Sequence, residues 1–287
     1  MTLEVAIPDT SLTDCPDLRQ KTMKIGQLAR AFSVFKVENV IIYKTTSEGK
    51  MQRDSVLLER MLRYMDTPQY LRRGAFSMSP SLKYAGTLPP LRTRSHPIET
   101  KVSSVLDGEV RWGLQASPGK VDIGLDQLID YEPSLSTRDP TLFRLKRVNG
   151  TLQLEKTERP SLDFYFGFDV KVVEDITEYL RNQASKTRIA LSRQGPPYAS
   201  IEFDIKSVVE NTRNLIAIFG GPKHGIRELV GAKKTQLKSV IDFWTNTVND
   251  QGTETVRIEE AMWISLSLFN NSFGSTITKP GFYVFKK

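Results

Sequence analysis

Apolar and polar positions follow two different periods along the first sixty-five residues of the chain. Short apolar runs at 3–9 and 37–43 have the length and β-branched content of buried strands. The segments 18–35 and 52–65 instead repeat apolar residues at the spacing of a helix. This alternating order of strands and helices predicts a parallel sheet covered by helices.

The pattern changes between residues 98 and 172. Short alternating segments predominate there, and few of them have a helical period. Asn149-Gly150, between "FRLKRV" and "TLQLEK", is typical of a tight β-hairpin. About five strands of this length suit a small OB-like barrel, a common platform for nucleic acids. We therefore expect a β-barrel over 98–172, inserted into a discontinuous α/β domain that comprises residues 1–97 and 173–287.

The α/β rhythm resumes after residue 173. The pattern predicts helices over 173–184, 203–213 and 257–270, and strands over 187–193, 214–219, 238–244 and 281–287. Apolar residues surround the helix 257–270 so widely that we expect it to be deeply buried.

Composition narrows the class of protein. The chain has 287 residues, 39% of them hydrophobic, which is enough for a sizeable core. It has no run of 18 apolar residues, and its acidic N-terminus does not have the pattern of a signal peptide. Cys15 is the single cysteine, and His96 and His224 lack the spacing of metal ligands, so we expect no metal site. These features are typical of a cytoplasmic protein without a membrane segment.

Positive charge is concentrated in one part of the chain. Eleven Lys or Arg and five Asp or Glu lie between Lys44 and Lys101, an excess of six in a chain of formal net charge +7. The stretch 71–94 mixes its cations with Tyr, Phe and Pro and contains no acid. This composition favours a polyanion such as RNA as the partner. The cations of the helix 52–65 can equally form a solvated face.

Three loops of the C-terminal half carry the candidate chemistry. They lie at 192–197, 219–225 and 245–261, and each follows a predicted strand. Because ligands of parallel sheets bind at the carboxyl ends of the strands, we expect the loops to form one composite pocket. The chain lacks the phosphate-binding patterns G-x-x-x-x-G-K-[ST] and, after a strand, G-x-G-x-x-G. A pocket of backbone groups with few charges suits a nucleoside, such as the adenosine of S-adenosylmethionine.

Three segments of the sequence resemble motifs of the SPOUT superfamily of RNA methyltransferases, and they occur in the same order. They are "KIGQLARAFSVFKVENVIIY", "LIAIFGGPKHGI" and "TETVRIEEAMWISL". The split domain, the phrase "YLRRGAFSMSPSLKYAGTLPPL" and the phrase "SRQG" resemble the archaeal and eukaryotic branch of that superfamily. For this branch the implied product is N3-methyluridine.

The resemblance implies a parallel-sheet domain with a deep trefoil knot and a homodimer with cofactor sites near its interface. It implies S-adenosylmethionine as methyl donor, a structured RNA such as ribosomal RNA as substrate, and a catalytic role for Arg30. For the cofactor we expect contacts from Leu191, Ser192, Phe219, Gly220, Gly221, Gln251, Gly252, Thr255 and Val256. For RNA we expect contacts from Arg72, Arg73, Arg92, Arg94, Arg144, Lys146 and Arg147.

Other interpretations remain open. The methyl acceptor could be a ribose 2′-hydroxyl or another base position, or the protein could be a non-catalytic RNA-binding or assembly factor on the same fold. An arginine on an amphipathic helix, such as Arg30, is commonly solvated or paired with a carboxylate. Glu259 can simply complement the dipole of the helix it opens.

Overall fold

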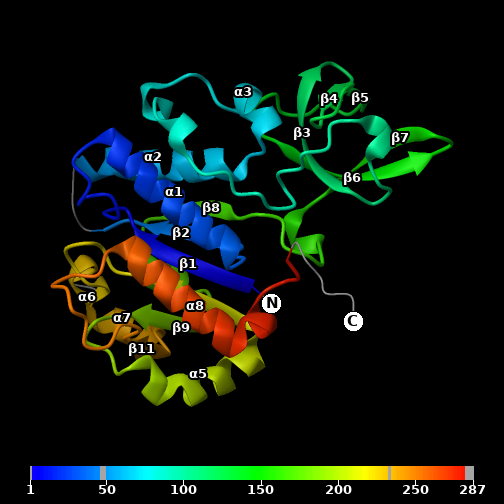
Figure 1. Ribbon diagram of the computed structural model, residues 1–287. Helices are drawn as coiled ribbons and strands as arrows, with labels where there is room; N and C mark the ends of the chain where they lie inside the picture. The colour runs from blue at the N-terminus through cyan, green and yellow to red at the C-terminus, as the bar shows by residue number, and fades with distance from the viewer. Residues whose placement is uncertain (1, 46–49, 232–233, 282–287) are drawn as a thin grey trace.

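Six parallel strands form the central sheet of the protein (Figure 1). The computed structural model describes residues 2–45, 50–231 and 234–281. The strands of this sheet are β1 (Thr2–Pro8), β2 (Asn39–Tyr43), β8 (Asp169–Val173), β9 (Thr187–Leu191), β10 (Asn214–Ile218) and β11 (Phe243–Thr245). Their order is β11-β9-β10-β1-β2-β8, and all neighbours are parallel. The predicted parallel α/β sheet is therefore confirmed.

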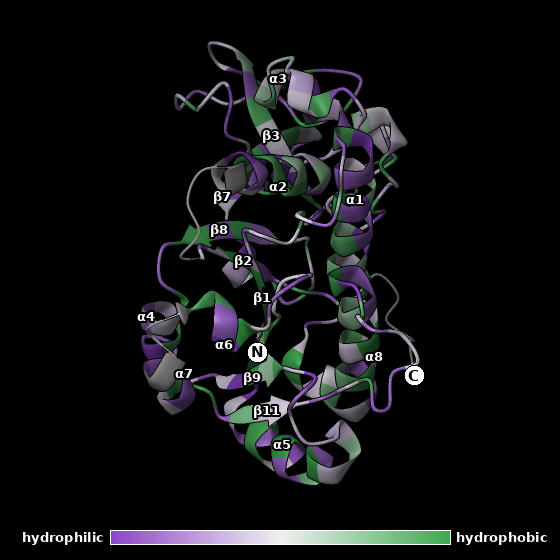
Figure 2. Ribbon diagram, turned by 90° about the vertical axis from the view of Figure 1, so that its left-hand side faces the viewer, coloured by the Kyte–Doolittle hydropathy of each residue, from purple (hydrophilic) through white to green (hydrophobic). Residues whose placement is uncertain are grey.

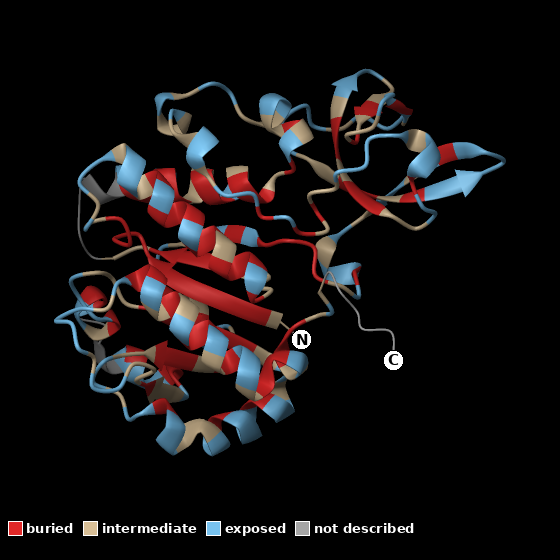
Figure 3. Ribbon diagram, viewed as in Figure 1, coloured by how far each residue is buried: buried red, intermediate tan, exposed pale blue. Residues whose placement is uncertain are grey.

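Helices cover both faces of this sheet. They are α1 (Leu18–Val34), α2 (Lys50–Asp66), α4 (Ile176–Arg181), α5 (Tyr198–Thr212), α6 (Ile226–Leu229), α7 (Lys234–Val240) and α8 (Ile258–Ile277). Val5 and Ile7 of β1 pack with α1, α2, α5 and α8, whereas Ala6 packs with α4, α6 and α7. In Figure 2, α1 and α8 lie on one side of the sheet and α4, α6 and α7 on the other. Burial on both faces explains why the strands β2 and β10 read as almost continuous apolar runs (Figure 3).

A second, antiparallel sheet lies between β2 and β8 in the sequence. Its strands are β3 (Val110–Ser117), β4 (Lys120–Asp122), β5 (Ile129–Asp130), β6 (Thr141–Val148) and β7 (Thr151–Thr157), in the order β5-β4-β3-β6-β7. Asn149 and Gly150 join β6 to β7 with φ angles of 51° and 81°, as a two-residue turn with two left-handed residues requires. The predicted hairpin is confirmed.

Two predicted strands need correction. The sequence pattern places the segment at 169–172 in the barrel, but β8 pairs with β2 and extends the parallel sheet at its edge. Half-exposed edge strands alternate like antiparallel ones, so the local pattern does not reveal the partner. The strand predicted over 238–244 is helical as far as Val240, because Leu237 and Val240 lie one helical turn apart in the core. The strand predicted at the C-terminus lies, from residue 282 onward, outside the described residues.

A short four-residue helix, α3 (Arg72–Ala75), and several 3-10 turns lead from α2 to the second sheet. The hydroxyl of Tyr70 donates to the backbone oxygen of Trp112 on β3, at 2.8 Å. The segment after α2 is thus attached to the antiparallel sheet.

A buried ionic cluster holds the two sheets together. Arg159, which follows β7, forms an ion pair with Asp66 at the end of α2 and another with Asp169 of β8, at 2.6 Å. Its guanidinium also lies 4.8 Å from the ring centroid of Trp112 on β3. The carboxylate of Asp66 accepts a hydrogen bond from the backbone N–H of Phe168 at 2.9 Å. Arg159 therefore touches elements of both sheets.

We expect Arg159→Met to lower the free energy of unfolding by about 3–5 kcal/mol, because it leaves the Asp66 carboxylate buried without its cation. Denaturant unfolding followed by circular dichroism measures this loss. Lys146→Met, which breaks the exposed pair of Lys146 with Glu155, is the control and should cost no more than about 1 kcal/mol. Equal losses of unfolding free energy in the two variants would contradict the conclusion that the Arg159 cluster holds the two sheets together.

His96 is half-buried beside the end of α2. Its Nε2 lies 2.9 Å from the backbone oxygen of Met65, and its Nδ1 lies 2.9 Å from Thr93 Oγ1 and 3.1 Å from Ser95 Oγ. Nε2 donates to the carbonyl, and Nδ1 accepts from a hydroxyl. Burial lowers the pKa of His96.

We expect acid to destabilise the protein through His96. Because the folded pKa is depressed, the unfolded chain takes up the proton first, so stability is full above pH 6.5 and falls as the pH decreases below it. Each unit of depression adds about 1.4 kcal/mol to the loss. Unfolding of the wild type and His96→Gln between pH 8 and pH 5 tests this, since the variant should lack that part of the decline. If the stability of both proteins decreases equally as the pH falls, His96 is not the source of the acid destabilisation.

Candidate cofactor-binding site

The loops that follow β9, β10 and β11 meet at one cavity of about 250 Å³ at the carboxyl ends of these strands. Eight of the nine residues that the sequence predicts at the cofactor line it. They are Leu191, Ser192, Phe219, Gly220, Gly221, Gln251, Thr255 and Val256. The ninth, Gly252, is exposed and does not line the cavity. The composite pocket that the sequence predicts is present in the described part of the chain.

Hydrogen bonds fix the loop after β9 against the loop after β11. The backbone N–H of Asn246 donates to the backbone oxygen of Pro196 at 2.8 Å. The side chain of Arg193 donates to the backbone oxygen of Glu254 at 2.9 Å. Arg193 and Asn246 also line the cavity, and sequence reasoning missed both, because neither type of residue marks a ligand site on its own.

The absence of a side chain at two glycines permits close approach of these loops. A Cβ at Gly195 would lie 2.8 Å from the backbone N, Cα and C atoms of Thr245, closer than real Cβ atoms approach. A Cβ at Gly220 would lie 3.1 Å from the Cα of Gly225. Glycine is therefore a steric requirement at Gly195, whereas a side chain at Gly220 would require its own loop to shift slightly.

The loop after β10 is anchored by its own backbone and by a buried tyrosine. Phe219 donates its N–H to the backbone oxygen of Ala6 at 2.9 Å and accepts from the hydroxyl of Tyr43 at 2.7 Å. Burial raises the pKa of Tyr43 well above its usual range, so the hydroxyl stays protonated and donates. Gly221 donates to the backbone oxygen of His224 at 2.9 Å. These bonds hold Phe219 and the glycines in place.

Backbone donors remain available at the cavity. Within the described residues, the backbone N–H groups of Gly220, Thr255 and Val256 have no hydrogen-bond partner. Apolar side chains, Leu191, Phe219 and Val256 among them, line it as well. A nucleoside offers flat apolar faces together with hydrogen-bond acceptors, so these residues fit the adenosine of S-adenosylmethionine.

The two glutamates at the start of α8 have different partners. Glu260 accepts from the backbone N–H of Arg257 at 2.9 Å and caps the helix. Glu259 is buried, and its carboxylate lies 3.0 Å from the ammonium of Lys24 on α1. Lys24 is 4% exposed and pairs also with Asp14, at 2.6 Å. The simple helix-dipole role considered for Glu259 is therefore incomplete, because Glu259 joins α8 to α1.

Arg30 lies on α1 away from the cavity of its own chain. Lys24 contacts Glu259, which follows the cavity residue Ile258. Arg30 is six residues further along α1, or about 9 Å. Its guanidinium donates to the backbone oxygens of Pro90 and Leu91, at 3.2 and 2.7 Å. No carboxylate among the described residues pairs with it.

Internal contacts engage five of the seven cations predicted for RNA. Arg72 donates to backbone oxygens at the end of α2, Arg94 lies over the ring of Phe164, Lys146 pairs with Glu155, and Arg144 and Arg147 donate to backbone oxygens. Arg73 and Arg92 are exposed, and neither has a partner among the residues that the structure describes. These two are the freest of the set to meet a phosphate.

The parallel sheet carries a composite cavity at the carboxyl ends of its strands, which is where α/β proteins commonly bind their ligands. The family model described as "Putative RNA methyltransferase" matches residues 2–269. The chain therefore belongs to this family and is an RNA methyltransferase. Among the described residues, no helix is long and apolar enough to span a membrane.

Similar proteins occur in archaea and animals. An uncharacterized protein of Halobacterium salinarum is 30% identical, over 93% of this chain and 98% of its own length. The 28S rRNA (uridine-N(3))-methyltransferase of Mus musculus is 25% identical, over 97% of this chain and 78% of its own length. The human enzyme of the same name is 26% identical, over 93% of this chain and 77% of its own.

Proposed function

We propose that the protein transfers the methyl group of S-adenosylmethionine to N3 of a uridine in a structured RNA such as ribosomal RNA. The observation that carries this proposal is the cavity in which three separate loops meet and two of them present free backbone amides. The similarity over most of the chain to enzymes named for uridine N3 methylation supports the choice of acceptor.

S-adenosylmethionine, when bound, supplies a methyl group that is already activated on a sulfonium. The protein therefore has to position the uridine and stabilise the negative charge that develops as N3 loses its proton. We assign this charge stabilisation to Arg30, whose guanidinium stays protonated and cannot itself accept the proton. The amides of Gly220, Thr255 and Val256 would hold the adenosine.

We further propose that the α/β domain, which contains β1, β2 and β9 to β11, has a trefoil knot. We also propose that the protein forms a homodimer. In support of the knot, α8 follows the edge strand β11 and returns across the sheet to pack against α1. Met23 on α1 and Ile264 on α8 are 51% and 37% exposed, and such side chains suit an interface between copies. In such a dimer, an Arg30 remote from its own cavity can serve the cavity of the other chain.

We propose that the antiparallel sheet, which begins at β3 and ends at β7, is an OB-like domain that contributes to RNA binding. In support, Val121 of β4 and Phe143 and Leu145 of β6 belong to one hydrophobic core, separate from the cores of the parallel sheet. With the free cations Arg73 and Arg92 of the preceding segment, this domain would contact phosphates without reading sequence.

The experiment that tests this function is transfer of an isotope-labelled methyl group to total RNA, followed by nucleoside identification. We expect label in N3-methyluridine. Label in a 2′-O-methylated nucleoside would reassign the acceptor, and RNA that stays unlabelled while the protein binds S-adenosylmethionine would favour an assembly factor.

A further inference from the structure

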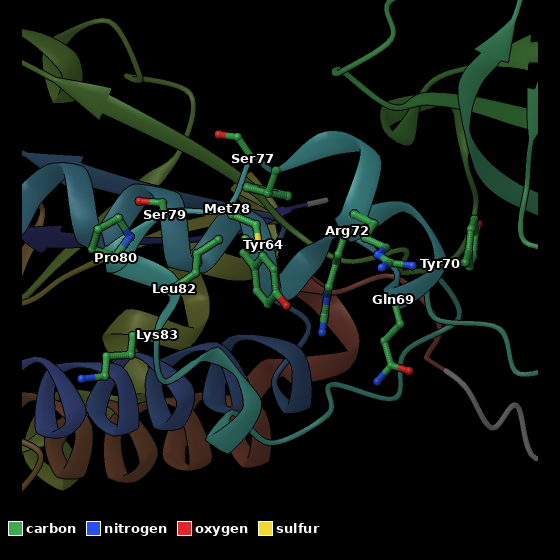
Figure 4. A pocket seen from close by; sticks show the side chains of 12 residues that line it. Tyr64, Gln69, Tyr70, Arg72, Ser77, Met78, Ser79, Pro80, Leu82 and Lys83 are labelled. Carbon is green, nitrogen blue, oxygen red and sulfur yellow. The ribbon is translucent and has the colours of Figure 1, made fainter.

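A second cavity, of about 920 Å³, lies between the end of α2 and the segment that follows it. It shares no lining residue with the cofactor cavity. In Figure 4 Tyr64 lies in the middle of the view, with Leu82 and Lys83 on one side and Arg72 and Gln69 on the other. Its volume is in the range of small-molecule and cofactor sites, yet nothing in the proposed methyl transfer uses it.

An aromatic surface forms one side of this second cavity. The ring centroids of Tyr64 and Phe76 are 5.3 Å apart, with the rings at 72° to each other. Arg72 also contacts Tyr64, with its guanidinium 4.6 Å from the ring centroid. The same guanidinium group donates to the backbone oxygens of Met65 and Thr67. Arg72 therefore builds the cavity, whereas the sequence predicts that it contacts RNA directly.

Unpaired positive charge lies beside these rings. Arg73 and Lys83 line the cavity and are exposed. Within the described residues Arg73 has no partner, and the ammonium of Lys83 lies 5.3 Å from the ring centroid of Tyr84. No carboxylate is among the described residues that line the cavity. Met78, also a lining residue, is fully exposed. A ligand that fits must carry negative charge together with a flat apolar group.

A nucleotide has this combination, and an unpaired one exposes the face of its base. Aromatic side chains that stack bases, placed next to cations that follow the phosphates, are the general means of binding single-stranded nucleic acid. The segment that forms the cavity continues along α1, where a Cβ at Gly26 would lie 2.9 Å from Pro89 and where Arg30 holds Leu91. The segment that forms the cavity therefore also contacts Arg30, the residue to which we assign stabilisation of the charge on the uridine.

We propose that this cavity binds an unpaired nucleotide of the substrate RNA, with the base against Tyr64 and Phe76 and the phosphate at Arg73 and Lys83. The proposal rests on the proposed function in that RNA is taken as the substrate. It adds that the enzyme selects a single-stranded neighbour of the target uridine, at a place separate from the cofactor.

Binding of fluorescent RNA by the full chain, measured by anisotropy, tests the proposal. The probes are an oligoadenylate, which contains no uridine, and a fully paired RNA duplex. We expect Phe76→Leu, which keeps an apolar side chain but removes the ring, to weaken oligoadenylate binding about tenfold. Arg73→Ala with Lys83→Ala should weaken it similarly and flatten its salt dependence, by about 0.7 in the logarithmic slope for each phosphate that the protein no longer neutralises. Phe76→Leu, which changes no charge, should leave duplex binding unchanged.

The matched control is Lys206→Ala on α5, an exposed lysine that has no partner among the described residues. It removes one charge elsewhere and should leave both affinities unchanged. Wild-type affinity of the cavity variants for oligoadenylate, or equal losses of Phe76→Leu for oligoadenylate and duplex, would overturn the proposal. So would an acidic peptide that occupies the cavity while RNA does not. Oligoadenylate contains no uridine, so its binding does not depend on methyl transfer. The binding test therefore stays valid even if the protein does not methylate uridine.

Discussion

Replacing Arg30 with alanine is expected to lower methyl-transfer turnover about 10²–10³-fold, the usual effect of removing a group that stabilises charge in the transition state. Affinity for S-adenosylmethionine should not change, because the role assigned to Arg30 is at the uridine and not at the cofactor. The measurement is turnover with labelled donor, together with calorimetric titration of the cofactor. A loss confined to KM for RNA would indicate that Arg30 acts only by holding the backbone at Pro90 and Leu91.

Dependence on pH separates these two roles further. If Arg30 stabilises the anion at N3, turnover of Arg30→Ala should rise with pH more steeply than that of the wild type, because solvent then removes the proton more readily. Arg30→Lys keeps the charge and should recover part of the activity. The matched control is Arg19→Ala on the exposed face of α1, which should behave as the wild type. Wild-type turnover in Arg30→Ala would remove Arg30 from the mechanism.

The second large effect is expected from Gly195→Ala. The added methyl group would lie 2.8 Å from three backbone atoms of Thr245, so the loops after β9 and β11 must separate. Such overpacking costs about 1–3 kcal/mol. If the strain is released by opening the cavity, affinity for S-adenosylmethionine falls about tenfold to hundredfold. Calorimetric titration measures the affinity, and circular dichroism checks that the sheet is retained.

Gly252→Ala is the matched control for Gly195→Ala. A Cβ at Gly252 has nothing within 4 Å, and the residue does not line the cavity. Its affinity for the cofactor should equal that of the wild type. If the two glycine variants bind S-adenosylmethionine equally well, the close approach of the loops after β9 and β11 does not shape the cofactor cavity.

The sequence predicts the sheet best where both faces of a strand are buried. β2 and β10 are almost continuous apolar runs and β1 is interrupted by Glu4, and the sequence pattern locates all three strands and the Gly-Gly turn after β10 correctly. The pattern misplaces β8 because an edge strand exposes alternate residues, and only its pairing with β2 reveals the sheet to which it belongs. Pairing between distant segments leaves no local signal.

The site is predictable as three loops but not in all its residues. Gly220 and Gly221, which closely follow a strand, line the cavity, whereas Gly252, well beyond the end of β11, does not. The sequence does not distinguish Glu259 from Glu260, because burial beside Lys24 depends on how α8 packs on α1. This packing is set by contacts far apart in the chain.

The sequence predicts where positive charge is concentrated, but not which cations are free and which are engaged by internal contacts. The excess of cations between Lys44 and Lys101 correctly marks a region with free Arg73 and Arg92. Arg72, next in the chain to Arg73, is committed to Tyr64 and to backbone oxygens instead. Which of two neighbouring arginines remains free depends on the direction of each side chain from a short helix, and composition does not contain that information.

Titration of the wild-type protein with S-adenosylmethionine by calorimetry tests the central claim most directly, because the mechanism and the choice of substrate both depend on the cavity between the three loops. We predict saturable binding with one site in each chain. No detectable binding at millimolar ligand would contradict the account.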